Sequence, residues 1–284
     1  MTGLDVESKR QPKTADGWTA RLDLEYAARQ DRTVLVRNRH RGPLVVQRPL
    51  YPEKEVCHTC ILHPPGGVVG GDRLEIAVLA GAGANALLTT PGATKFYRSG
   101  GRRAVQNQHL HIDDGAVLEW FPQDNILFPG AEAVINTRID LAHGARFMGW
   151  EILCLGLPVN GRRFTGGSLA TRLSLHRESR PLLLERLRIV EENDLDRCAG
   201  LRSFPVTATF IATNGTADML SPLRELVTRE EEALYGVTQV DEVLVARYLG
   251  HSTFAAHELF MDIWSILRPE ITGRGACAPR IWAT

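Results

Sequence analysis

The chain has 284 residues, of which 44% are apolar, and its 33 basic and 33 acidic side chains cancel to a formal net charge of zero. A chain of this length can form one large domain or two small ones, and the apolar share is sufficient for a sizeable core. Because the charges balance, the composition argues against a nucleic-acid-binding protein and against a polybasic membrane-binding surface.

The N-terminal sequence and the cysteines indicate a protein of the cytoplasm. Residues 1–17 are polar and lack the apolar core of a signal peptide, so we expect a flexible segment there and a single β-rich domain over residues 18–284. No run reaches the roughly 18 apolar residues of a membrane span. The cysteines are scattered and odd in number, at positions 57, 60, 154, 198 and 277. This usage is typical of reduced intracellular thiols, and we expect a soluble, cytoplasmic protein.

Over residues 18–99 the sequence favours β-strands joined by tight turns. Apolar residues alternate with other residues over residues 22–26 and again over residues 74–78, which is the spacing of a half-buried strand. Glycine is frequent in the turns because it adopts positive φ without strain. The glycine-rich residues 66–72 lack both the Gly-Lys-Ser/Thr ending of a phosphate loop and the helix that follows a dinucleotide fingerprint. A nucleotide site is therefore not expected.

A short motif repeats in the middle of the chain. The pair Gly-Ala occurs at residues 83–84, 115–116 and 144–145, roughly 30 residues apart, and an apolar run follows each copy. A strand, a Gly-Ala turn and a second strand that recur at this interval predict strands stacked in a coil or a sheet built by repetition. An irregular antiparallel sandwich would give a similar spacing.

Helix signals occur only near the C-terminal end. The Ser-Pro pair at residues 221–222 fits the N-cap and first position of a helix that would close at Gly236. After a predicted strand over residues 243–249, Ser252 can cap a second helix, which Pro269 is expected to end. The patterns therefore predict two helices on a largely β body.

Four residues near position 60 could bind a soft metal ion. They lie within seven positions and are Cys57, His58, Cys60 and His63. Structural zinc normally needs a second ligand pair at some distance, and the remaining cysteines stand alone, which argues against it. A weaker, transient site for nickel, copper or zinc fits these ligand types. The alternative is a buried cysteine beside a histidine in a turn.

Two histidines and a glutamate form a second candidate set. His109 and His111 share one face of a predicted strand, and a hairpin centred on Asp114 would place Glu119 opposite His109. Such a set resembles the metal site of a cupin-like metal-dependent enzyme, although a cupin places its glutamate closer to the second histidine. A register slip of one residue would also turn Glu119 to the other face. Histidines on an exposed strand are the alternative, and no Gly-x-Ser-x-Gly motif is present.

Four carboxylates occur in apolar sequence, where an ionised group without a partner is energetically costly. They are Asp72, Glu119, Glu151 and Glu185. Each is expected to meet an arginine, a backbone N–H group or water. If several of them surrounded one hydrated cavity, they would form a series of weak cation sites. A conduit requires such sites, because an ion must enter and also leave.

Long blocks of the sequence resemble the UreD (UreH) family of urease accessory proteins. The most specific blocks are HPPGGVVGGDRL at residues 63–74 and TTPGATKFYRS at residues 89–99. Further matching blocks are GPLVVQRPLYPE, LEWFPQDNILF, FMGWEILCLG and the ending PRIWAT, so the similarity extends from about residue 18 to the C-terminus. The resemblance implies a mostly β fold, an irregular helix-like coil of stacked strands and sheets, with two α-helices near the C-terminal end.

The resemblance also implies a non-catalytic role in urease maturation. Proteins of this family bind apo-urease together with UreF and the GTPase UreG and help to insert nickel. Nickel is then a transient cargo, and no tightly bound cofactor is implied. An internal hydrated passage is thought to carry the metal, and the positions that match its polar lining are Asp72, Thr94, Glu151 and Glu185.

Two models of the nickel chemistry stay open at this point. In the first, the dispersed carboxylates line a passage, and this model fits the sequence better. In the second, nickel is held at a discrete site that includes Cys57, His58 and His63 before release.

The C-terminus offers a candidate partner contact. Arg280 and Trp282 are residue types that often anchor interfaces. Packing of Trp282 into the core is an equal alternative, and the sequence does not separate the two.

Overall fold

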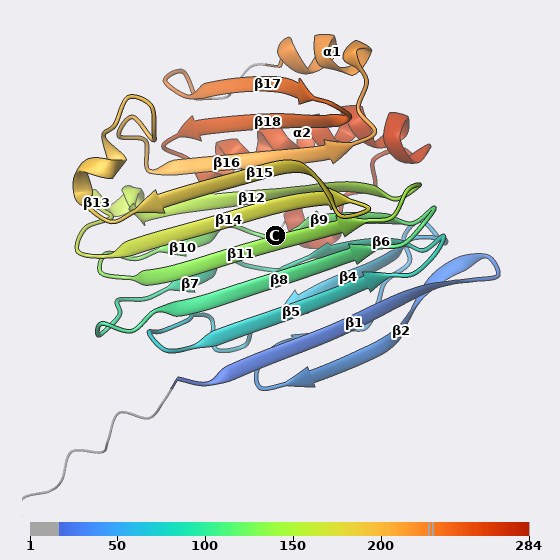
Figure 1. The fold of residues 1–284 in the computed structure, drawn as a ribbon, viewed down its shortest axis with the longest axis horizontal. Coiled ribbons are helices and arrows are strands. Elements are labelled where there is room, and N and C mark those ends of the chain that lie inside the picture. Colours follow the sequence, from blue (N-terminus) through green and yellow to red (C-terminus); the bar gives the residue numbers. More distant parts are fainter. Residues whose placement is uncertain (1–16, 227, 229, 284) are drawn as a thin grey trace, which may run out of the picture.

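The computed structural model describes residues 17–226, 228 and 230–283. The expected flexible segment at residues 1–17 thus lies, except for Gly17, outside the described residues. Strands dominate the described part and form two sheets that face each other (Figure 1). Within that part, no helix has both the length and the apolar character needed to cross a bilayer.

The first sheet contains seven strands. In spatial order they are β15 (Arg180–Ile189), β14 (Ser168–Arg177), β11 (Glu132–Leu141), β8 (Ala104–Ile112), β5 (Arg73–Ala80), β1 (Thr19–Arg29) and β2 (Arg32–Arg41). The strands from β14 to β1 run parallel, and each edge strand pairs antiparallel with its neighbour.

The second sheet contains eleven strands. Its main path is β17 (Leu234–Val240), β18 (Val243–Gly250), β16 (Val206–Thr213), β12 (Arg146–Leu157), β9 (Val117–Phe121), β6 (Asn85–Thr89), β4 (Cys57–Leu62) and β3 (Val45–Val46). Three short strands lie off this path: β10 (Asn125–Leu127) and β13 (Arg162–Arg163) pair with β12, and β7 (Thr94–Phe96) pairs with β10. The strands β4, β6, β9 and β12 run parallel.

The chain forms a coil because it alternates between the two sheets. It passes from β5 to β6, from β8 to β9 and from β11 to β12, and each of these crossings is one of the Gly-Ala turns. Successive turns stack through backbone hydrogen bonds. The N–H group of Gly83 donates to the carbonyl of Asp114 over 3.0 Å, and that of Arg146 donates to Ala116 over 2.9 Å. The predicted coil of stacked strands is confirmed.

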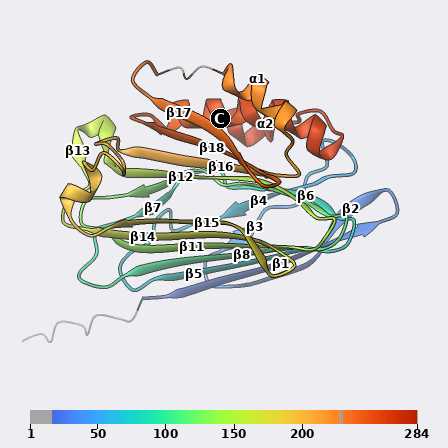
Figure 2. The same ribbon diagram turned by 45° about the horizontal axis from the view of Figure 1, so that its top comes forward.

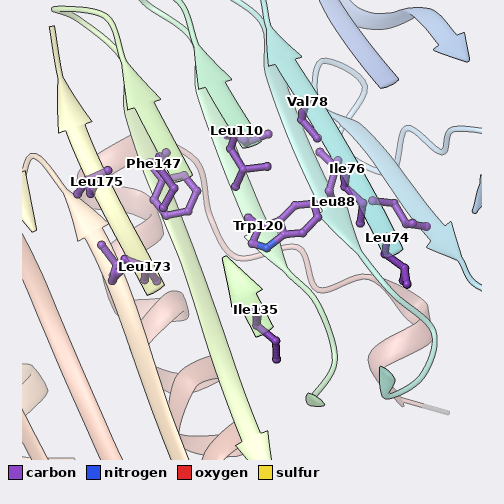
Figure 3. Close-up of a cluster of buried hydrophobic side chains, with 14 of the residues drawn as sticks. Leu74, Ile76, Val78, Leu88, Leu110, Trp120, Ile135, Phe147, Leu173 and Leu175 are labelled. Carbon is purple, nitrogen blue, oxygen red and sulfur yellow. The ribbon is translucent and has the colours of Figure 1, made fainter. Parts of the chain in front are cut away.

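Two apolar layers hold this arrangement together. The larger fills the space between the sheets, and ten of its side chains are labelled in Figure 3. The second lies between the second sheet and α2 (Thr253–Thr272), which covers the outer face of β12 and β16 (Figure 2). Strand β12 serves both layers, because successive side chains of a strand point to opposite faces.

The second predicted helix is confirmed at its start and corrected at its end. The side chain of Ser252 accepts a hydrogen bond from the N–H group of Ala255, as an N-cap residue does. Pro269 lies inside α2 rather than after it, and the helix ends at Gly273, whose N–H group donates to the carbonyl of Pro269.

The first predicted helix is much shorter than expected. Helix α1 covers only Leu220–Arg224, and Gly236 lies within β17. The apolar spacing near Leu234 is helical, but antiparallel pairing with β18 places these residues in a strand. Tertiary pairing therefore overrides a weak local preference here. The remaining helical turns are 3-10 helices: η1 (Pro158–Asn160), η2 (Glu192–Leu195), η3 (Ala217–Met219) and η4 (Arg280–Ala283).

Candidate functional site

Two rows of mostly polar residues run across the strands, one in each sheet. In the first sheet, one row of directly paired residues on β8, β11, β14 and β15 consists of Gln108, Thr137, Leu173 and Glu185. In the second sheet, a row on β12, β16 and β18 consists of Glu151, Thr209 and Arg247. Directly paired residues point to the same face of a sheet, and both rows line hollows between the sheets.

Three neighbouring cavities follow these rows. Cavity A has a volume of about 290 Å³ and lies at β5 and β8, and cavity C has a volume of about 310 Å³ and lies at β15. Cavity B, of about 20 Å³, lies between them. It shares Gln108, Trp120, Pro122 and Asn125 with cavity A, and Glu151, Leu173 and Thr209 with cavity C. A volume of that size holds about one water molecule, so cavity B is a narrow neck between two larger hollows.

Glu151 stands where cavities B and C meet. On β12, Trp150 and Ile152 face α2, so the alternation turns Glu151 toward the cavities. Its Oε1 atom is enclosed and has no hydrogen-bond partner among the described residues. Burial, together with the negative charge of Glu185, raises the pKa of Glu151 to about 7. Near neutral pH, the protonated and ionised forms of Glu151 are therefore both populated.

Glu185 faces cavity C from the opposite sheet and has a cationic partner. Its Oε1 atom forms an ion pair with the guanidinium group of Arg247 on β18. The hydroxyl of Thr209 donates to its Oε2 atom over 3.4 Å. Cavity C thus contains two carboxyl groups in different states, one neutralised by arginine and one without a cation beside it in the described chain.

Cavity A is lined by Thr94 and His63. The Nε2 atom of His63 is enclosed and has no hydrogen-bond partner among the described residues. Burial lowers the pKa of His63, although the charge of Asp72 opposes this shift. A neutral imidazole with an unused nitrogen can act as a weak metal ligand.

Asp72 holds the backbone rather than a cavity wall. Its Oδ1 atom accepts a hydrogen bond from the N–H group of Trp18 over 3.2 Å, and its Oδ2 atom accepts one from Val69 over 2.9 Å. It is 2% exposed and is not among the residues that line cavities A, B and C. Of the four positions matched to a passage lining, Thr94, Glu151 and Glu185 line these cavities, and Asp72 acts on His63 through its charge.

The structure does not bring the Cys-His residues near position 60 together at one point. Strand β4 places Cys57 in the layer between the sheets, where its thiol contacts the Tyr51 hydroxyl, whereas the His58 imidazole is hydrogen-bonded to Glu53 over 2.6 Å. Cys60 is half-buried on β4, and His63 lies beyond the strand at cavity A. Among the described residues, no group of three or more potential ligands is close enough to hold a metal ion. The alternation of the strand separates these residues.

The cupin-like set is also not brought together, and the expected hairpin at Asp114 is wrong. The turn after β8 carries the chain to the other sheet, so His109 and His111 lie in the first sheet and Glu119 lies in the second. His109 and His111 are exposed and pair with Asp140 and Asp113. The alternative of surface histidines is therefore correct.

Glu119 meets an arginine, as expected of a carboxylate in apolar sequence, and belongs to a buried ion network whose members the sequence did not identify. Arg268 of α2 is fully buried and donates to both oxygens of Glu119 over 2.9 to 3.3 Å, and to both oxygens of Glu53 over 2.6 and 2.8 Å. Trp264 donates to Glu119 over 2.7 Å. Burial would raise the pKa of Glu53, but hydrogen bonds from His58 and Arg268 lower it to about 2. The network ties α2 to β9 and to the segment before β4.

The uncharged lining of the cavities was also missed. Gln106 and Gln108 on β8 are 5% and 6% exposed, so both face the interior. The next inward-facing residues of this strand, Leu110 and Ile112, are apolar. A polar residue in the inward phase is the signal that could have identified them.

The two C-terminal candidates have different surroundings. Trp282 packs against Phe121, Trp150 and Trp264, with ring centroids 5.3 to 5.7 Å apart, and its indole N–H group donates to Thr89 over 2.9 Å. Arg280 lies in η4 and is exposed. Trp282 is thus a packing residue in this structure, and Arg280 remains accessible.

Comparison with known proteins assigns a family to this architecture. The model of the family described as UreD urease accessory protein matches residues 19–283. A urease accessory protein UreD of Alcanivorax borkumensis is 45% identical over 273 residues, which cover 94% of this chain and 93% of the relative. The protein of that name from Pseudomonas entomophila is 45% identical over 99% of this chain and 100% of its own. The one from Klebsiella aerogenes is 41% identical over 96% and 99%.

Proposed function

This chain belongs to the UreD family of urease accessory proteins, and we propose that it conducts nickel between its two sheets on the way to urease. As a member of an accessory-protein family it has a role in urease maturation and is not an enzyme. In this proposal the chain is a cytoplasmic scaffold that binds apo-urease together with UreF and UreG. Nickel is a passing cargo.

The line of cavities A, B and C is the observation that carries the proposal. It crosses the interior between the sheets and combines the imidazole of His63 with the carboxyl groups of Glu151 and Glu185. Imidazole and carboxylate are suitable ligands for a first-row divalent ion. Because these groups are dispersed rather than clustered, each site binds weakly, and a conduit needs weak sites from which the ion can leave.

The arrangement favours the passage over a discrete holding site. A site that retains nickel requires several ligands around one point, and the described residues contain no such group. The Cys57 thiol is engaged with Tyr51 and lies apart from His58, which is bound to Glu53. We therefore infer that the chain releases nickel as readily as it takes it up.

Replacement of Glu151 tests this function. Apo-urease is incubated with nickel and with complexes of UreF, UreG and either the wild-type chain or the Glu151→Gln variant, and urease activity is measured. We expect the variant to lower activation by about tenfold or more, because the isosteric amide removes a charge from the neck of the passage.

A matched control is Glu75→Gln. Glu75 lies on β5, on the outer face of the first sheet, where it forms an ion pair with Arg73 and accepts a hydrogen bond from Asn107. This variant should activate urease as the wild type does, and both variants should still co-purify with the partner proteins. Full activation by Glu151→Gln would refute the passage, and loss of the partners would assign Glu151 to folding or to an interface.

A further inference from the structure

The ion pair between Glu185 and Arg247 places a permanent positive charge in the wall of cavity C. Arg247 extends from β18 toward β15, so that its guanidinium group neutralises a carboxylate of the other sheet. An arginine does not lose its proton in a protein. While this pair is formed, Glu185 is unavailable to an incoming cation, and the guanidinium group repels that cation.

This arginine is able to leave its partner. The side chain of Arg247 is 48% exposed, and that of Glu185 is 23% exposed. An ion pair with this much solvent contact contributes little free energy, because water competes for both charges. By contrast, Arg268 is 0% exposed and held by Glu53 and Glu119, so it has no freedom to move. The two arginines therefore have different roles.

We propose that Arg247 is a displaceable counter-ion that sets the cation affinity of cavity C. In the absence of a cation, its guanidinium group occupies the acidic wall. A divalent first-row cation that enters between Glu151 and Glu185 displaces it toward solvent, and it returns when the cation moves on. The inference rests on the proposed function, because it assumes that cations use cavity C.

The weakness of the site follows from this competition. Two available carboxyl groups would attract a divalent ion more strongly than one. Arg247 competes for one of them, so release costs less free energy. A passage benefits from this property, because an ion held tightly at cavity C would block those behind it.

The experiment measures nickel affinity of the full chain by isothermal titration with Ni²⁺ alone. Wild type is compared with Arg247→Met, Arg247→Lys, Glu185→Gln, Glu151→Gln and the double variant that combines Arg247→Met with Glu185→Gln. We expect Arg247→Met to bind Ni²⁺ about two- to fivefold more tightly, in keeping with the loss of one exposed ion pair. Arg247→Lys, which retains the charge, should bind as the wild type does, and Glu185→Gln should bind more weakly.

The double variant separates displacement from a general charge effect. If Arg247 acts through Glu185, its replacement should change nickel affinity little in the Glu185→Gln background. Arg186 is the matched control, because it also borders cavity C but forms no ion pair with Glu185. Arg186→Met should change the affinity by less than about twofold.

The possible results distinguish this inference from the proposed function. Weaker nickel binding by Glu185→Gln, together with unchanged binding by Arg247→Met, would refute the counter-ion role of Arg247 but not the proposed passage. Unchanged nickel affinity in both Glu185→Gln and Glu151→Gln would remove cavity C as a cation site, and the inference would fall with it. Equal increases in nickel affinity in Arg247→Met and Arg186→Met would show a general effect of positive charge and would also refute the counter-ion role of Arg247.

Discussion

Among the single residues of the interior, Glu151 differs from the other carboxylates because no cation or backbone N–H group of the described chain stabilises its charge. Asp72 is stabilised by backbone N–H groups, and Glu119 is stabilised by Arg268. Glu151 has neither kind of partner at its enclosed oxygen among the described residues, and its pKa rises to about 7. The proton therefore takes the place of a cation at this site, and an entering metal ion would replace that proton.

This shift makes protein stability depend on pH in a defined direction. Between the ordinary pKa of 4.5 and about 7, the folded chain retains a proton on Glu151 that the unfolded chain loses. The free energy of unfolding contributed by this group therefore falls as the pH rises through that window. The charged groups around it are Glu185, Arg186 and Arg247, which border the same cavity.

We expect Glu151→Gln to gain stability relative to wild type as the pH rises from 5 to 7.5, because the amide has no proton to lose. Urea unfolding of the metal-free chain at several pH values checks this difference. Glu75→Gln, which changes a half-buried carboxylate on the outer face of the first sheet, is the comparison variant. A constant difference between wild type and Glu151→Gln across this range would contradict the raised pKa.

Arg268 provides a second prediction at this scale. Arg268→Met leaves Glu53 and Glu119 without their cation in a buried setting, and we expect a loss of about 3–5 kcal/mol in the free energy of unfolding. The comparison is Arg138→Met, which removes an exposed ion pair with Asp140 and should cost less than about 1 kcal/mol. Chemical denaturation of both variants measures the costs, and equal costs would show that the buried network is not structural.

At the scale of elements, the coil was predictable and the site was predictable only in part. The Gly-Ala repeat and the alternation of apolar residues follow from local backbone geometry, so they indicated the crossings between the sheets. The carboxylates attracted attention because charge in apolar sequence is costly. The partners of each carboxylate come from strands that are distant in the sequence. A single sequence does not show which strands pair or in what register.

The errors have the same origin. The hairpin expected at Asp114 is a crossing between sheets, and the residues around Leu234 form β17 rather than a helix. In both cases the local pattern allows two structures and the long-range pairing selects one. Gln108, Thr209 and Arg247 were missed because such residues are common on exposed strand faces, and only the fold reveals which face is inside.

The glycine turns at which the chain crosses from one sheet to the other can be tested by mutation. Gly115 has a φ of +69°, which L side chains rarely adopt, although a Cβ atom there would meet nothing closer than 3.9 Å. We expect Gly115→Ala to lower the free energy of unfolding by about 1–2 kcal/mol through backbone strain alone. Gly92 serves as the control, because no atom lies within 4 Å of a Cβ atom there and its φ is not positive. Similar melting temperatures for the two variants would show that the crossing tolerates a side chain.

At the scale of the whole molecule, the proposed passage runs across the strands rather than along them. Its walls come from both sheets, from β5 and β8 at cavity A to β15 and β18 at cavity C. A coil that places alternate strands in opposite sheets leaves a space between the layers, and the inward residues decide whether that space is apolar or wet. Here most inward residues are apolar, and one transverse band is polar.

Cavity B is the point where such a route is most easily closed. Thr137 on β11 lines cavity B and is 6% exposed, so Thr137→Phe would fill a hollow of about 20 Å³. We expect this variant to lose most urease activation in the presence of UreF, UreG and nickel, while Ni²⁺ binding at cavity C persists. Thr137→Ser keeps the hydroxyl and adds no volume, so it should activate normally, and Thr137→Leu should be intermediate. Overpacking costs about 1–3 kcal/mol, so thermal melting must show each variant folded. Full activation by a folded Thr137→Phe would mean that nickel does not pass through the neck, since no ion could cross a filled cavity.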